Sequence, residues 1–62
     1  MHPYEVGALV RAPERPEWGV GQVQSIIKDK HGERVTVNFE GAGKLVIHPE
    51  QVELELVAPD RL

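Results

Sequence analysis

The stretch Trp18-Gly19-Val20-Gly21-Gln22-Val23 decides the fold that this sequence predicts. It holds the single tryptophan of the chain, two closely spaced glycines and the start of a β-branched run. A glycine directly after a large aromatic residue lets the backbone turn at positive φ, and a second glycine in a β-branched run leaves room for a bend. We therefore expect a corner at Trp18 and Gly19, followed by a strand.

Alternation of apolar and polar residues on both sides of this corner predicts five strands. The expected strands are residues 8–12, 19–28, 34–40, 44–48 and 52–57. In the second strand, Val23, Ser25 and Ile27 are expected to share one face, and Gln22, Gln24, Ile26 and Lys28 the other. The side chains expected to face inward are Val35, Val37 and Phe39 in the third strand and Val52, Leu54 and Leu56 in the last. Ten residues of strand reach roughly 33 Å, so we expect the second strand to bend and to serve two sheets.

Proline and glycine mark the connections between these strands. Two prolines three residues apart make 13–17 a stiff excursion, neither helix nor strand, that leads to Trp18. The polar segment 29–32 ends in glycine and predicts a hairpin, 41–43 predicts a second turn, and 49–51 predicts one helical turn that begins with proline. The sequence therefore predicts an all-β fold, a small five-stranded SH3-like (Tudor-like) half-open barrel with one short helical turn before the last strand.

Length and composition narrow the class of protein. The 62 residues form one domain at most, with an ordered core over about 6–57 and loose segments over 1–5 and 58–62. No cysteine is present, and ten acidic residues against seven basic ones give a net charge of -3, unlike the basic charge of most nucleic-acid binders. No segment approaches the roughly 20 apolar residues that span a bilayer, so we expect a soluble, cytoplasmic protein.

The sequence offers no set of residues for catalysis. Ser25 is the only serine and Thr36 the only threonine, both within expected strands and neither beside an obvious base. The three histidines, His2, His31 and His48, have no metal-ligand spacing. We therefore expect no enzyme activity, no cofactor and no metal site.

Trp18 admits two interpretations. The indole could close one end of a barrel that contains a single phenylalanine, and Tyr4 could cover the same end. Alternatively, a tryptophan at the tip of a proline-stiffened loop, flanked by Arg15 and Glu17, could be an interface anchor. Partial burial would satisfy both interpretations.

Four stretches, 8–11, 18–23, 35–39 and 43–45, together resemble a known group of domains. They are similar to the Tudor-like, SH3-barrel domains attached to bacterial transcription and repair proteins, and in particular to a stand-alone bacterial family of uncharacterised function. Its wider relatives are the C-terminal domain of UvrD/PcrA-type helicases and the RNA-polymerase-interacting domain of CarD-type regulators. The resemblance covers about residues 6–57, and its motif is short and mostly structural.

The resemblance implies a non-enzymatic protein-interaction module that docks on RNA polymerase, or on another transcription or DNA-repair partner, through an exposed sheet edge and the aromatic corner. Carried onto this chain, the structural glycines are Gly19, Gly21 and Gly43, and the lysine after the hairpin glycine is Lys44. The helicase and CarD relatives more often carry phenylalanine at the corner and histidine before the loop, whereas this chain has Trp18 at the corner and Ala12-Pro13 before a longer, proline-bearing loop. The residues expected to contact the partner are Trp18, Arg15, Glu17, Gln22 and Lys44.

Three other functions stay open from the sequence. Ribosome-associated KOW domains share this barrel and bind nucleic acid, which would need a contiguous basic face made by Arg11, Lys28, Arg34 and Lys44. A methyl-lysine reader would need several aromatic side chains around one cation. Exposed edges that pair with one another would make the protein a structural homo-oligomer.

Overall fold

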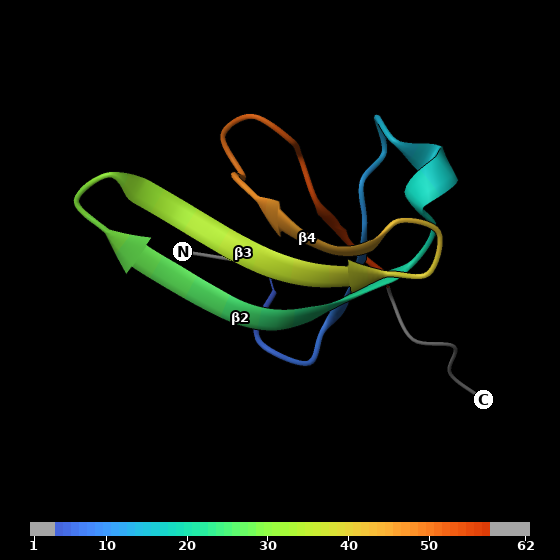
Figure 1. Cartoon of the computed structure of the whole chain (residues 1–62), viewed down its shortest axis with the longest axis horizontal. Helices are drawn as coiled ribbons and strands as arrows, with labels where there is room; N and C mark the ends of the chain where they lie inside the picture. The colour runs from blue at the N-terminus through green and yellow to red at the C-terminus, as the bar shows by residue number, and fades with distance from the viewer. Residues whose placement is uncertain (1–3, 58–62) are drawn as a thin grey trace.

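The computed structural model describes residues 4–57, which form one antiparallel sheet of five strands and one short 3-10 helix (Figure 1). The elements are β1 (Leu9–Arg11), η1 (Pro16–Trp18), β2 (Gly21–Asp29), β3 (Gly32–Phe39), β4 (Gly43–Ile47) and β5 (Glu55–Leu56). The strand order is β4-β3-β2-β1-β5, so β4 and β5 are the two edges. This architecture confirms the predicted all-β fold, an SH3-like barrel of five strands.

Strand β2 organises the sheet, because it pairs with β1 near its start and with β3 along its whole length. The far end of the β2–β3 hairpin projects beyond the other strands (Figure 1). The hairpin closes where predicted, at residues 29–32, with Gly32 at a φ of 115°. At this turn the backbone N–H of His31 donates to Asp29 Oδ1 at 2.9 Å.

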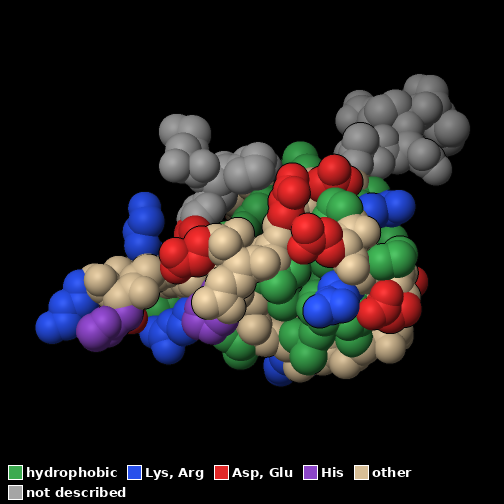
Figure 2. Space-filling model, turned by 90° about the horizontal axis from the view of Figure 1, so that it is seen from above, with side chains coloured by type: hydrophobic (Ala, Val, Ile, Leu, Met, Phe, Trp, Pro, Cys, Tyr) green, Lys and Arg blue, Asp and Glu red, His purple; other side chains and the backbone are tan. Residues whose placement is uncertain are grey.

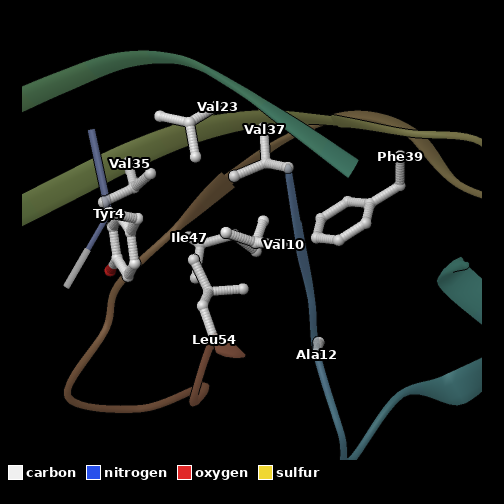
Figure 3. Close-up of a cluster of buried hydrophobic side chains, with 9 residues drawn as sticks. All are labelled: Tyr4, Val10, Ala12, Val23, Val35, Val37, Phe39, Ile47 and Leu54. Atoms are coloured by element: carbon white, nitrogen blue, oxygen red, sulfur yellow. The ribbon is translucent and has the colours of Figure 1, made fainter. Parts of the chain in front are cut away.

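The core lies on the inner side of the curved sheet (Figure 3). Its buried side chains are Tyr4, Val10, Ala12, Val23, Val35, Val37, Phe39, Ile47 and Leu54. The predicted inward set of the third strand, Val35, Val37 and Phe39, is confirmed.

Tyr4 belongs to this core, which the expectation of a loose segment over 1–5 did not anticipate. Its ring lies beside Val35, at the opposite end of the core from Phe39 (Figure 3), so it does not cover the Trp18 end. Residues 1–3 and 58–62, where loose ends were predicted, lie outside the described residues.

The prediction that Ile27 shares a face with Val23 is wrong, because β2 contains a β-bulge. Val23 pairs with Val37, but Ser25 pairs with Thr36, so Gln24 is an extra residue and the alternation changes phase. After the bulge, Ile26 lies opposite the buried Val35 and packs against the core. Ile27 instead points outward and is 48% exposed.

The last strand is shorter than predicted. The helical turn expected at 49–51 is a single hydrogen-bonded turn in which the N–H groups of Gln51 and Val52 both donate to the His48 carbonyl, at 2.8 and 3.0 Å. Leu54 then enters the core, and Glu55–Leu56 pair with β1, next to which the N–H of Val57 donates to the Leu9 carbonyl at 2.8 Å. Leu56 was predicted to face inward and is 50% exposed, because it lies in this two-residue edge strand.

The proline-bearing excursion also departs from the prediction, since Pro16–Trp18 form the 3-10 helix η1. Pro16 occupies the first helical position, where the missing N–H is not needed and the fixed φ of proline suits a helix. The N–H of Gly19 closes the turn by donating to the Pro16 carbonyl at 3.2 Å.

Candidate protein interface

Trp18 lies at the end of η1 and packs against the core. Its ring is half-buried and tilted by 48° on the ring of Phe39, with 5.1 Å between the ring centroids. Gly19 directly after it has a φ of 74°, the corner that the sequence predicted. Phe39 covers part of the indole, and the rest of the indole lies at the surface. This geometry agrees with an indole that closes one end of the core, and it leaves an exposed part available for contact with a partner protein.

Gly21 has a different role from that of the corner glycine. A Cβ at this position would lie 2.5 Å from Val37 Cγ1 and 2.6 Å from Phe39 Cδ1. The start of β2 therefore crosses the core side chains of β3 so closely that only glycine fits without movement.

The β3–β4 turn is held against this corner by two backbone hydrogen bonds. The N–H of Glu40 donates to the Val20 carbonyl at 2.9 Å, and the N–H of Gly41 donates to the Trp18 carbonyl at 2.8 Å. Gly41 packs against the backbone of η1 with no space for a Cβ, a role the sequence analysis missed because the contact joins segments far apart in the chain. The start of β4 is thus fixed beside the corner.

Within residues 4–57, β4 pairs with β3 on one side only, so its other edge is open. Leu45 and Ile47 face the core, whereas Lys44 and Val46 are exposed, Val46 at 57%. The five residues of β4 make it the longer edge, since β5 has two residues. A strand with unpaired backbone groups on one side is a template for pairing with another chain.

A groove of about 430 Å³ opens at the same end of the sheet. It is lined by Arg11, Ala12, Pro13, Pro16, Gly19, Val20, Glu40 and Glu55. These residues come from the end of β1, the proline-bearing loop, the approach to β2, the β3–β4 turn and the start of β5. The sequence analysis missed this groove, because it forms only when the ends of four strands meet.

The structure brings together most of the expected partner-binding residues. Arg15 and Glu17 are exposed on and beside η1, next to Trp18, and Lys44 follows the turn that is fixed to the Trp18 carbonyl. Gln22 does not join them, because it lies on the outward face of β2, with its Nε2 donating to the Gly7 carbonyl at 3.3 Å. The candidate interface therefore consists of the Trp18 corner (Arg15, Glu17 and Trp18), the groove and the β4 edge.

The residues of the possible basic face are not gathered on one surface. Lys28 pairs with Glu33 and Ile27 pairs with Arg34, so Lys28 and Arg34 point to opposite faces of the hairpin. Arg34 forms an ion pair of 3.1 Å with Asp29. Arg11 and Lys44 lie at the other end of the sheet. Figure 2 shows basic and histidine side chains on the projecting hairpin, and a mixture of hydrophobic, acidic and basic side chains over the body.

Further features of residues 4–57 concern metal binding, membrane spanning and the aromatic side chains. Over residues 4–57, no group of three or more His, Cys, Asp or Glu side chains could hold a metal ion, and no helix is long and apolar enough to cross a bilayer. Burial, with a smaller contribution from the negative charge of Glu33, raises the pKa of Tyr4. Trp18, Phe39 and Tyr4 do not form an aromatic cage, because Phe39 is buried beneath Trp18 and Tyr4 lies at the other end of the core.

Comparison with known proteins identifies a family. A family model described as "Protein of unknown function (DUF3553)" matches residues 4–57, which is the whole of the described fold. No curated protein and no solved structure matches the chain.

Proposed function

The chain belongs to DUF3553, a family described as proteins of unknown function, and we propose that it is a non-enzymatic module that binds another protein by adding a partner strand to β4. The observation that carries this proposal is the open edge of β4 beside the Trp18 corner. Main-chain hydrogen bonds along β4 would supply affinity, and side chains at the corner would supply selectivity.

The arrangement at the start of β4 supports this division of roles. The β3–β4 turn is hydrogen-bonded to the corner, so a strand laid along β4 would run toward Trp18, Arg15 and Glu17. Lys44 and Val46 alternate with the inward residues of β4 and would flank the added strand. The half-buried indole already packs on Phe39, so it would lose less conformational entropy than a fully exposed side chain when a partner contacts it.

RNA polymerase is the first partner to test. What supports it is the resemblance to the barrels of UvrD/PcrA-type helicases and CarD-type regulators, carried by Trp18, Gly19, Gly21 and Lys44. With this partner, the protein would act in bacterial transcription or DNA repair, in the cytoplasm.

The experiment measures binding of the labelled protein to purified bacterial core RNA polymerase at physiological salt. Val46→Lys places a charge on the open edge of β4, a device by which natural edges avoid strand pairing, and we expect it to weaken binding at least about tenfold. Ile27→Lys is the matched control, because Ile27 is a similarly exposed apolar residue on the outward face but away from the edge. It should change affinity less than about twofold.

The pattern of losses separates the modes of binding. Loss in Val46→Lys and Trp18→Ala, with Ile27→Lys unchanged, supports strand addition with a tryptophan anchor. Equal loss in Val46→Lys and Ile27→Lys would mean that the partner lies on the outward face of the sheet, against our proposal. Sedimentation of the protein alone at micromolar concentration shows whether β4 instead pairs with a second copy.

A further inference from the structure

The groove at the Trp18 end of the sheet combines an apolar lining with charges that are not paired. Ala12, Pro13, Pro16 and Val20 supply the apolar surface, and Glu40 and Glu55 enter it from different elements. Neither glutamate forms an ion pair with another residue of 4–57, and both side chains are exposed. The groove is therefore an apolar surface with two carboxylates along it.

The backbone of Glu40 is held by a hydrogen bond, and its side chain lies beside Gly19. Its backbone N–H is bound to the Val20 carbonyl, and its side chain lies along Gly19, with Oε1 3.7 Å from the place where a Cβ on Gly19 would be. A carboxylate with a fixed backbone loses less entropy on binding a cation than one at the tip of a mobile loop.

Among the described residues that line the groove, Arg11 is the one cation. It is the cross-strand partner of Glu55 in the β1–β5 pair, but no ion pair joins these two side chains. With two carboxylates and one guanidinium, the part of the lining that residues 4–57 supply carries one net negative charge. A polyanion such as nucleic acid would be repelled here, whereas a cation would be attracted.

We propose that this groove binds a cationic side chain, arginine or lysine, presented by an extended segment of a partner protein with apolar residues on either side. The carboxylates of Glu40 and Glu55 would receive the charge, and the proline-lined surface would pack against the aliphatic stem. This inference rests on the proposed function only in taking the ligand to be a polypeptide, and it does not require strand addition at β4.

The test uses two blocked pentapeptides, alanine-valine-arginine-valine-alanine and the same sequence with citrulline. Citrulline has nearly the shape of arginine without the charge, so the pair isolates the ionic contribution. In a titration followed by amide NMR, we expect the arginine peptide to shift the signals of Gly19, Val20, Glu40 and Glu55. It should bind about threefold to tenfold more tightly than the citrulline peptide, as two partly exposed ion pairs allow.

Three variants of the protein test whether the charges of the groove determine the affinity for the arginine peptide. Glu40→Gln and Glu55→Gln keep the side-chain shape and should each weaken the arginine peptide about twofold to threefold, while the citrulline peptide is unaffected. Arg11→Gln removes the competing cation and should strengthen the arginine peptide by a similar factor. A role of these residues in folding alone would not move the three variants in opposite directions.

Several results would overturn the inference. It fails if the arginine peptide does not bind, if the two peptides bind equally, if the shifted amides lie elsewhere, or if Arg11→Gln weakens binding. Ile27→Lys should leave arginine-peptide binding unchanged, because Ile27 lies on the outward face and does not line the groove, whereas Val46→Lys tests the β4 edge. Loss of polymerase binding in that variant concerns only the proposed strand addition, so the two proposals can fail separately.

Discussion

Replacing Ile26 and Ile27 separately by threonine tests the β-bulge that sets the two faces of β2. Threonine keeps the β-branched shape, so both variants retain a similar preference for a strand and differ in what the side chain contacts. Ile26 is half-buried against Val35, whereas Ile27 is 48% exposed. Uninterrupted alternation from Val23 would give the opposite order of burial.

The structure sets the magnitude of each change. At Ile26, the change to threonine removes the terminal methyl group, whose burial contributes about 0.8 kcal/mol to stability. It also replaces the adjacent methylene group by a hydroxyl, and placing that hydroxyl against apolar side chains costs about 1–3 kcal/mol. Because the site is only half-buried, we expect a loss of about 2 kcal/mol. At Ile27 the hydroxyl can be hydrated, so the loss should stay within about 0.5 kcal/mol.

Urea unfolding followed by Trp18 fluorescence measures both values, because Trp18 packs on Phe39 only in the folded state. A chain of this size has a stability of about 3–9 kcal/mol and an m value of about 1 kcal/mol/M. Ile26→Thr should therefore lower the midpoint by about 2 M, and Ile27→Thr by less than about 0.5 M. An equal or larger loss in Ile27→Thr would show that β2 alternates without a bulge at Gln24.

Three further predictions follow from other contacts. Gly21→Ala should destabilise the fold by about 1–3 kcal/mol in thermal melts, because the added methyl group has no space between β2 and β3. Burial, and to a smaller extent the charge of Glu33, raises the pKa of Tyr4 in the folded protein. The contribution of Tyr4 to folding stability is therefore complete below the unfolded pKa of about 10. It is lost as the pH rises from there through the higher pKa of the folded state. Urea unfolding at pH 9 and 11 should show this loss in the native protein and a smaller one in Tyr4→Phe. Arg34→Gln should change stability by less than about 1 kcal/mol, because its ion pair with Asp29 is exposed on both sides, and double-mutant unfolding with Asp29→Asn measures the pair.

The strands that the sequence predicted best are those whose alternation is unbroken. Val35, Val37 and Phe39 are separated by polar residues, so their facing could be assigned from the pattern alone, and all three are buried. In β2 the pattern gives no signal at the decisive point, because Ile26 and Ile27 are both apolar. Which of them enters the core depends on the register with β3, a contact between distant parts of the chain.

The candidate interface could be predicted only in part, for a similar reason. The corner at Trp18 and Gly19 is a local feature, since an aromatic residue and a glycine at positive φ suffice to make it. The groove is not local, because Glu40 directly follows β3 and Glu55 begins β5, and these two strands are not neighbours in the sheet. Their meeting depends on the sheet curving so that the ends of several strands approach one another.

The open edge of β4 follows from the way the core is completed. The connection from β4 to β5 turns at His48, through two hydrogen bonds to its carbonyl, and then inserts Leu54 among the buried side chains. It thereby crosses the core and delivers β5 to β1, at the far side of the sheet from β4. A tighter connection would form a hairpin and pair β5 with β4, which would close the edge and leave the core without Leu54. The packing that stabilises so short a chain therefore also exposes the strand to which we assign binding.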